Sequence, residues 1–219
     1  IHDIEKPPKK GLSTFANFLQ KQKLSNKNGR EIWNKLNKED SIILERSTNT
    51  IVNQVNALKI MVNEFAEYAR PTKIKKDTVR IDSLVDEVIE LYEINKMISI
   101  KKEKNIPIIY ADQNKLRQVI INLIENSQDA LKEIKKPKIK IFIKKKVNEV
   151  ELIVEDNGIG IPDEIIGRIF EPYITSKKTG TGFGLAIVHK IIEEHDGKIK
   201  IERISNSGTR VIITFNSGK

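Results

Sequence analysis

The stretches Asn122-Leu-Ile-Glu-Asn126-Ser, Asp156-Asn-Gly-Ile-Gly160 and Thr179-Gly-Thr-Gly-Phe-Gly-Leu185 belong together, and they are the most informative part of this chain. The first lies inside an apolar helical pattern, the second follows an alternating strand pattern, and the third opens another helical pattern. Each alone is a weak signal, because amide pairs, Asp-Asn-Gly turns and glycine-rich loops are common. In this order they indicate an ATP site built on asparagine, aspartate and glycine, without a Walker lysine.

The composition is that of a soluble protein with a core. The chain has 219 residues, 38% of them hydrophobic, enough for one large domain or two small ones. The absence of cysteine excludes disulfides and thiolate metal sites. No apolar run is long enough to cross a bilayer, and no secretory signal is present. Because the sequence begins with Ile1 rather than Met, we expect it to be a piece of a longer protein.

The formal net charge of +9 has two readings. One is attraction to an anion, such as a nucleotide, a nucleic acid or an acidic partner. It is also what a solvated, lysine-rich surface produces. No basic patch with interleaved aromatic residues and no nucleic-acid motif is present, so we favour the solvated surface and expect no nucleic-acid partner.

The N-terminal third predicts a helical hairpin. Residues 36–69 form one helical pattern, and from Ile51 its apolar positions alternate steps of four and three, as in a heptad seam. Pro71 ends this helix. A shorter helix is expected over residues 9–24, and residues 25–29 form a turn-rich connector. Two helices cannot bury so narrow an apolar stripe, so we expect a dimeric four-helix bundle built from residues 1–75.

Residues 76–219 predict a second domain with mixed secondary structure, so the whole chain is α+β. After a polar hinge over residues 71–77, helices are expected from Asp82, as the N-cap, to about Asn95, from Asp112 through Asn126, and over Gly182–His195. Strands are expected over Ile98–Lys102, Ile108–Tyr110, Lys138–Lys145, Val150–Glu155, Lys198–Arg203 and Thr209–Phe215. Helices covering one face of a mixed sheet form an α/β sandwich.

Asn122 and Asn126 are candidates for the metal and phosphate part of the site. They are four residues apart, so they lie on one face of their helix, beside an apolar stripe. Amide oxygens suit Mg²⁺, which prefers oxygen ligands and keeps several waters. Either residue alone would be interpreted as a surface or capping asparagine. The pair beside an apolar face is harder to explain by packing.

Asp156 is the candidate for the adenine. A carboxylate at the end of an apolar strand can accept a hydrogen bond from the exocyclic amine, and Gly158 and Gly160 would let the backbone approach the ring. The alternative is an ordinary Asp-Asn-Gly turn.

The third stretch is the candidate for the phosphates. Gly180, Gly182 and Gly184 precede a helix, whose N-terminal N–H groups favour phosphate, and Lys177 and Lys178 add positive charge. Residues 171–183 are rich in Gly, Thr, Ser and Lys, so we expect them to form a flexible lid.

These motifs resemble those of sensor histidine kinases, in the superfamily that includes gyrase, Hsp90 and MutL. Asn122–Ala130 resembles the N box, Asp156–Gly160 the G1 box, Ile169–Pro172 the F box and Gly180–Leu185 the G2 box, most closely as in the nitrogen-regulation kinases NtrB and NtrY. The resemblance implies ATP and Mg²⁺ as cofactors. It implies that Asn126 is the Mg²⁺ ligand, that Asn122 lies beside the phosphates, that Asp156 binds the adenine amine, and that Thr209 lies near the same edge.

The same family accounts for the N-terminus. His2-Asp-Ile-Glu-Lys-Pro7 resembles the H box, which implies His2 as the phosphoacceptor, with Asp3 orienting its ring. The family usually has other residues at Lys6 and Pro8, and the position of Lys6 is the one that positions water for dephosphorylation of the regulator. Phosphatase activity is therefore less expected than autophosphorylation. His189 and His195 are expected to be a surface and a helix-end histidine.

The resemblance implies the cytoplasmic kinase core of a dimeric bacterial sensor kinase, with any membrane anchor outside this sequence. Such a core phosphorylates His2 and passes the phosphoryl group to an aspartate of a response regulator. One alternative is an ATP-binding scaffold, in which the altered H box makes transfer slow or absent. A second is an ATP-driven clamp of the gyrase or MutL kind. That class has a glutamate where Asn122 stands, and asparagine is a poor base, so the clamp is disfavoured.

Overall fold

The computed structural model describes residues 38–70, 73–91, 97–177, 180–204 and 208–217. The chain divides into two compact units, Ile1–Ile60 and Met61–Lys219. The helix expected over residues 9–24, the connector after it, and His2 and Asp3 all lie outside the described residues. The predicted domain boundary after residue 75 stays a prediction. Among the described helices, none combines the length and apolarity that crossing a membrane requires.

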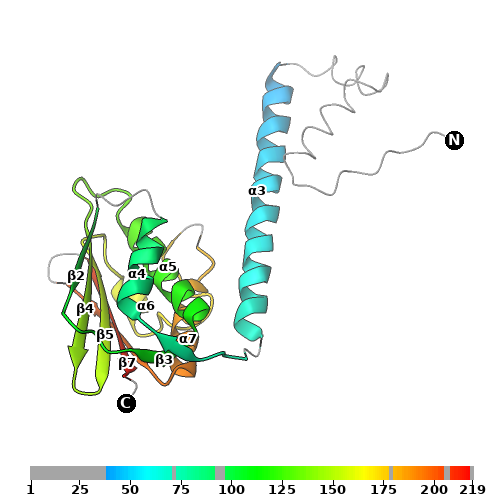
Figure 1. The fold of residues 1–219 in the computed structure, drawn as a ribbon. Coiled ribbons are helices and arrows are strands. Elements are labelled where there is room, and N and C mark those ends of the chain that lie inside the picture. Colours follow the sequence, from blue (N-terminus) through cyan, green and yellow to red (C-terminus); the bar gives the residue numbers. More distant parts are fainter. Residues whose placement is uncertain (1–37, 71–72, 92–96, 178–179, 205–207, 218–219) are drawn as a thin grey trace. The chain divides into compact units, whose positions relative to one another are not determined.

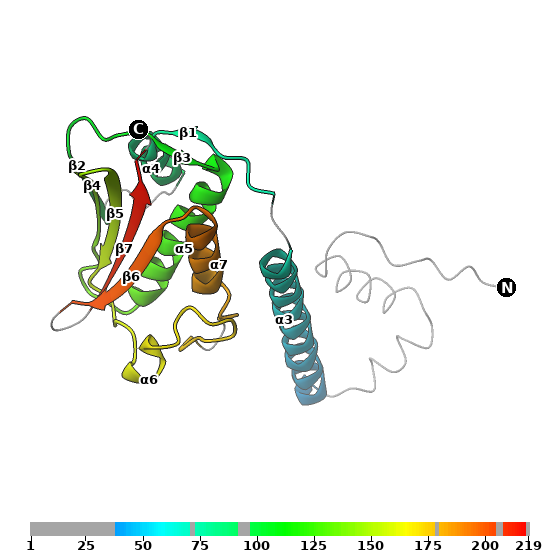
Figure 2. The same ribbon diagram turned by 90° about the horizontal axis from the view of Figure 1, so that it is seen from below.

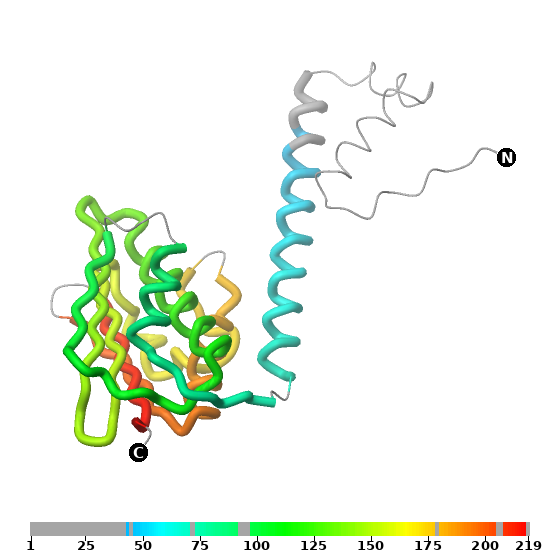
Figure 3. Tube along the Cα trace, viewed as in Figure 1, coloured from blue at the N-terminus to red at the C-terminus, as the bar shows by residue number. Residues whose placement is uncertain are grey.

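The long helix predicted before Pro71 is α3, Lys38–Ala69, and it is continuous to its last turn, where the amide of Arg70 donates to the carbonyl of Ala66 (Figure 3). Its apolar seam is exposed in the single chain. The side chains on this seam are those of Ile51, Val55, Leu58, Val62 and Phe65. Their spacing follows the predicted alternation of four and three.

The second unit is built on a mixed sheet whose strand order is β2-β4-β5-β7-β6. The strands are β2 (Ile98–Lys102), β4 (Ile139–Lys146), β5 (Glu149–Asp156), β6 (Lys198–Arg203) and β7 (Thr209–Asn216). β2 runs parallel to β4, and the other neighbours are antiparallel. The β4–β5 hairpin is the yellow-green loop at the lower left of Figure 3. A separate two-stranded sheet pairs β1 (Asp77–Val79) with β3 (Ile109–Ala111).

Three helices cover one face of the five-stranded sheet: α4 (Ile81–Glu90), α5 (Gln113–Ala130) and α7 (Gly184–Glu194) (Figures 1 and 2). The core lies between these layers. Helix residues such as Leu116 and Ile120 are buried there together with the inward residues of the strands, such as Ile141. The predicted α/β sandwich is confirmed, because the period of 3.6 in the helices and the period of 2 in the strands each put one apolar face inward.

Two local predictions were wrong. Asp82 does not cap α4: the N-cap is Arg80, which makes no side-chain cap, and Asp82 lies in the first turn, paired with Arg80 at 2.6 Å. The helix starts earlier because the fully buried side chain of Ile81 belongs to its packed face. α4 also ends at Glu90 rather than near Asn95. The short strand β1 and the four-residue helix α6 (Asp163–Ile166) were not predicted.

The predicted cap at Asp112 is confirmed. Its Oδ1 accepts the amides of Asn114 and Lys115 at 3.0 and 3.2 Å, and its Oδ2 accepts the amide of Lys75 at 3.0 Å. Burial raises the pKa of Asp112, but these backbone hydrogen bonds outweigh burial and hold it below its ordinary value. The side chain therefore joins the start of α5 to the segment before β1.

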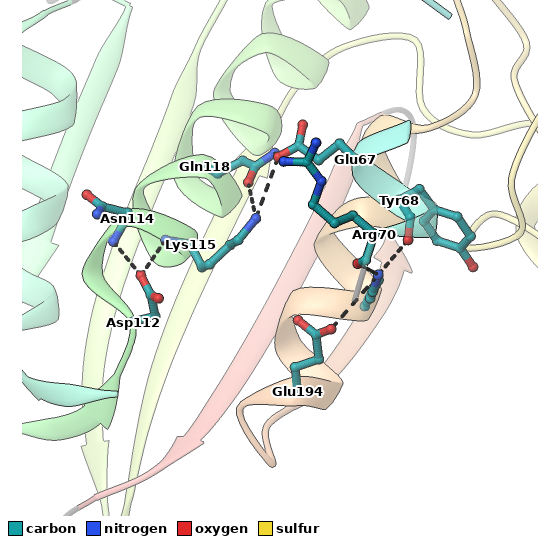
Figure 4. A network of polar contacts seen from close by, with 9 residues as sticks. Glu67, Tyr68, Arg70, Asp112, Asn114, Lys115, Gln118 and Glu194 are labelled. Carbon is teal, nitrogen blue, oxygen red and sulfur yellow. Dashed lines mark hydrogen bonds and ion pairs between the residues drawn. The ribbon is translucent and has the colours of Figure 1, made fainter. Parts of the chain in front are cut away.

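The last turns of α3 belong to the second unit and contact α5 and α7 (Figure 4). Glu67 accepts a hydrogen bond of 2.9 Å from Gln118 and lies 3.6 Å from the ammonium of Lys115. Lys190 of α7 donates to the main-chain carbonyls of Tyr68 and Arg70, which are among the groups that a helix end leaves unpaired. The end of α3 is thus held by the helices that carry the candidate site.

Candidate nucleotide-binding site

A cavity of about 250 Å³ opens between α5, the end of β5, the loop that follows it and the start of α7. Of the residues predicted for the site, this cavity is lined by Asn122, Asn126, Asp156, Gly160, Lys177, Gly182, Gly184 and Thr209. Gly158 and Gly180 are not part of the lining. Lys178 lies outside the described residues. The cavity thus gathers side chains and backbone from all three stretches.

The two asparagines of α5 differ in their environment. The Nδ2 of Asn122 is buried and has no hydrogen-bond partner within the described chain. The Oδ1 of Asn126 accepts a hydrogen bond of 2.8 Å from the ammonium of Lys177. A buried donor without a partner is costly, so Asn122 offers its N–H group to a ligand. The oxygen of Asn126 already faces a positive charge.

Asp156 ends β5 and is 7% exposed. Its Oδ1 accepts the amide of Gly158 at 2.8 Å and the amide of Thr209 at 3.3 Å. Burial raises the pKa of this carboxyl, although the two backbone hydrogen bonds oppose the shift. No hydrogen bond to Oδ2 occurs within the described residues, so this oxygen is available to an amine donor.

Gly158 packs closely against the end of α5. A Cβ added at this position would lie 2.6 Å from the Cβ of Ala130, at the end of α5. The next amide, that of Ile159, donates to the carbonyl of Ala130 at 3.1 Å. The glycine therefore allows the loop after β5 to touch α5 directly. The expectation that Gly158 lets the backbone approach a ring stays a prediction.

The N-terminus of α7 lies next to Asn126. α7 begins at Gly184 with Phe183 as its N-cap, and a Cβ at Gly184 would lie 3.7 Å from the Nδ2 of Asn126. Phe183 makes no capping hydrogen bond, so the N-cap residue leaves the first N–H groups of α7 without a side-chain acceptor. Free N–H groups at the start of a helix suit a phosphate group.

Phe183 anchors this helix start. It is fully buried, and its ring contacts Tyr173 of the preceding loop at a centroid distance of 4.8 Å. It also meets two residues of α3, Phe65 at 6.3 Å and Tyr68 at 6.0 Å. These contacts connect the glycine-rich stretch to the last turns of α3.

Glu64 and Asp129 line the cavity, although the sequence reasoning did not single them out. Asp129 lies three residues after Asn126, and its carboxylate contacts Lys177 at 2.7 Å. The helical spacing could have found it, since residues i and i+3 share a face. Glu64 comes from α3, and its Oε2 is buried with no hydrogen-bond partner in the described part of the chain. No local signal could have placed it here.

The two histidines of α7 have structural surroundings. His195 is the C-cap of α7, as expected, and is 5% exposed. Its Nε2 accepts the amide of Asp112 at 2.9 Å, so the other nitrogen, 2.7 Å from the carbonyl of Ile191, carries the proton. His189 stacks on Phe170 at a centroid distance of 4.7 Å. Neither ring lines the cavity.

Comparison with known proteins agrees with this geometry. Residues 111–219 match the family described as histidine kinase-, DNA gyrase B- and HSP90-like ATPase. An NtrY-like sensor histidine kinase of Rickettsia conorii is 32% identical over 181 residues, a match that covers 81% of this chain and 30% of that protein.

Solved structures of histidine kinases are also similar. The catalytic domain of the histidine kinase ThkA is 34% identical with a TM-score of 0.59, covering 65% of this chain and 96% of that domain. The structure of ThkA in complex with the response regulator TrrA is 27% identical with a TM-score of 0.68, covering 94% of this chain and 60% of that one.

The fold and the cavity therefore define an ATP-binding domain of the histidine kinase, gyrase B and HSP90 class. Within this class the chain belongs to the histidine kinases, and an NtrY-like sensor histidine kinase is among its relatives. It spans only about 30% of the length of its Rickettsia relative.

Proposed function

We propose that this chain is a kinase core that binds Mg·ATP, phosphorylates His2 and passes the phosphoryl group to an aspartate of a response regulator. The observation that carries the proposal is the convergence of Asn122, Asn126, Asp156 and the start of α7 on one cavity. This set offers a carboxylate for the adenine at one end, and amides with helix N–H groups for the phosphates at the other.

The chemistry of Asn126 fits a metal ion. Its amide oxygen faces the cavity and already accepts a hydrogen bond from an ammonium, which is a cation in the place where Mg²⁺ would bind. Within the described residues, no cluster of three or more imidazole or carboxylate side chains forms a metal site of its own. A single amide ligand, with phosphate oxygens and water completing the shell, suits Mg²⁺. When bound, the ion neutralises charge on the phosphates.

The other residues bind and orient the nucleotide. The carboxylate of Asp156 accepts a hydrogen bond from the exocyclic amine of adenine and thereby selects this base. Asn122 donates its unpaired Nδ2–H to a phosphate oxygen, and the first N–H groups of α7 donate to the same chain of phosphates. Phosphoryl transfer depends mainly on alignment and charge neutralisation, which these groups supply.

The transfer step uses the two residues of the H box. A ring nitrogen of His2 attacks the γ-phosphorus with its lone pair, the bond to the β–γ bridging oxygen breaks, and ADP leaves. Asp3 accepts the hydrogen bond from the other ring nitrogen and so orients the imidazole. His2 and Asp3 lie outside the described residues, and their roles rest on the sequence resemblance.

The exposed seam of α3 supports the proposed homodimer. Five large apolar side chains at heptad spacing, from Ile51 to Phe65, are between 45% and 63% exposed in the single chain. Such a stripe is stabilised by a partner helix. Light scattering of the purified chain should give twice the monomer mass, and Leu58→Asp should lower that mass towards the monomer.

The phosphorylation assay uses γ-labelled ATP with Mg²⁺ on a chain extended upstream of Ile1. The kinase should acquire acid-labile label that is lost in His2→Ala and kept in the control His189→Ala. Transfer is then followed as loss of this label to isolated receiver domains. The crystal structure of ThkA with the response regulator TrrA supports this choice of partner.

Other outcomes would favour the alternatives. An ATP-binding scaffold would bind nucleotide without any label on His2. A clamp-type ATPase would release phosphate over many turnovers and form no phosphohistidine.

A further inference from the structure

Lys177 connects the loop before α7 to α5 through two contacts. Its ammonium donates to the Oδ1 of Asn126 at 2.8 Å and to the Oδ2 of Asp129 at 2.7 Å. Asn126 and Asp129 are three residues apart, so one turn of α5 presents both oxygens to the same cation. All three residues line the cavity.

The position of this ammonium conflicts with a bound metal. If the proposed function is correct, the Oδ1 of Asn126 is the metal ligand. A Mg²⁺ ion would lie about 2.1 Å from that oxygen. An ammonium and a divalent cation that both contact one oxygen are close together, so they repel each other strongly. Lys177 therefore has to leave Asn126 when the metal and nucleotide arrive.

The ion pair with Asp129 holds Lys177 at α5 in the nucleotide-free site. Its side chain and that of Lys177 are 36% and 37% exposed, so the pair is partly shielded from solvent. The other oxygen of Asp129 pairs with Lys132, which is 2.7 Å away in the turn that follows α5. Lys132 is not part of the cavity lining. Asp129 thus pairs with one cation of the loop before α7 and one cation of the turn after α5.

We propose that Asp129 is a positioning residue that holds Lys177 on the metal-binding oxygen of Asn126 in the nucleotide-free site, and that Lys177 moves to the phosphates when Mg·ATP binds. The ammonium of Lys177 ties the loop to α5 and keeps the amide of Asn126 oriented for the metal. This proposal rests on the proposed function, since it needs a metal at Asn126 and phosphates beside it.

The test is hydrogen exchange, measured by mass spectrometry on peptides covering residues 171–177. In the nucleotide-free protein, Asp129→Asn should speed exchange in these peptides about fivefold, because a charge-assisted contact that ties the loop down is lost. Lys177→Gln should do the same. The double variant should be no faster than either single variant, because both remove one interaction.

The matched control is Lys132→Gln. It removes the other cation that pairs with Asp129 but leaves Lys177 in place, so exchange in residues 171–177 should stay at the wild-type rate. Equal acceleration in this control would overturn the proposal, as would additive effects of Asp129→Asn and Lys177→Gln or an unchanged rate in Asp129→Asn.

A second arm adds Mg²⁺ and ADP. The phosphates should then replace Asp129 as the partner of Lys177, so wild type and Asp129→Asn should exchange at similar rates. A fivefold difference that persists in the loaded protein would contradict the exchange of partners. Absence of nucleotide binding would sink the proposed function, whereas the nucleotide-free arm would still decide whether Asp129 holds Lys177.

Discussion

Thr209 and Asp156 lie side by side on β7 and β5, and the amide of Thr209 donates to the Oδ1 of Asp156 at 3.3 Å. Together with the amide of Gly158, this contact orients a carboxyl group that is 7% exposed at the edge of the cavity. Two backbone donors on one oxygen leave the other oxygen for a ligand. The carboxyl group of Asp156 is thereby oriented for binding, and burying it costs folding free energy.

Asp156→Asn should separate binding from stability. An asparagine Oδ1 can accept the same two amides, but it lacks the charge that binds an amine strongly. We expect ATP affinity to fall roughly 10- to 100-fold, the range of a hydrogen bond to a charged group. Isothermal titration calorimetry with ATP measures this, with Glu164→Gln on the exposed surface of α6 as the charge-matched control.

The same variant should be more stable at neutral pH. The pKa of Asp156 is raised in the folded state, mainly by burial, so ionisation costs folding free energy above the unfolded pKa. The wild type regains this free energy as pH falls through the raised pKa, and the advantage of Asp156→Asn should shrink in parallel. Urea unfolding from neutral to acid pH checks this, and an advantage that grows towards acid pH would contradict the assignment.

Glu64→Gln should strengthen ATP binding. The Oε2 of Glu64 is buried without a hydrogen-bond partner in the described chain, and the residue lines the cavity that would receive a triphosphate. Removing this like charge should raise ATP affinity about fivefold at low salt, with a smaller gain at high salt because of screening. Glu67→Gln is the control, since it makes the same charge change on α3 outside this cavity. Equal gains in both variants would point to net charge alone.

Gly182→Ala should damage the loop before α7. Gly182 has a φ of +75°, and an added Cβ would lie 2.5 Å from the carbonyl carbon of Tyr173. We expect a loss of at least about 1 kcal/mol in unfolding free energy from the backbone strain, and weaker ATP binding, since the loop must shift. Thermal unfolding and calorimetric titration measure the two effects.

Gly167→Ala is the control for this prediction. Gly167 has a φ of −69° with no atom within 4 Å of an added Cβ, so the change should be neutral or stabilising by up to about 1 kcal/mol. A Gly182→Ala variant as stable as the Gly167→Ala variant would show that the positive φ is not required.

His195→Ala should destabilise the second unit. It removes the acceptor of the Asp112 amide and leaves that N–H and the carbonyl of Ile191 without their ring partner. The expected loss is roughly 1–3 kcal/mol in unfolding free energy, with nucleotide affinity little changed because His195 is outside the cavity. Urea unfolding measures the loss, and ¹⁵N spectra of the ring should show the proton on Nδ1. A proton on Nε2 would contradict the assigned tautomer.

Much of the fold could be predicted because its signals are local. The buried alternation of Ile139, Ile141 and Ile143 marks β4, and the side chain of Asp112 caps α5 within three residues. β1 escaped prediction because three residues of a polar segment become a strand only by pairing with β3. The predicted cap at Asp82 was wrong because the burial of Ile81, a tertiary effect, makes the helix begin before Asp82.

The site divides in the same way. The amino-acid sequence determines which chemical groups the site contains, because each motif carries its residues at short fixed spacing. These groups are the amides of Asn122 and Asn126, the carboxylate of Asp156 and the glycines before α7. Packing alone decided that Lys177 lies on Asn126, that Glu64 enters the cavity and that Gly158 fits against Ala130. These partners are far apart along the chain, so only the burial of α5 and α7 on one sheet brings them within contact distance.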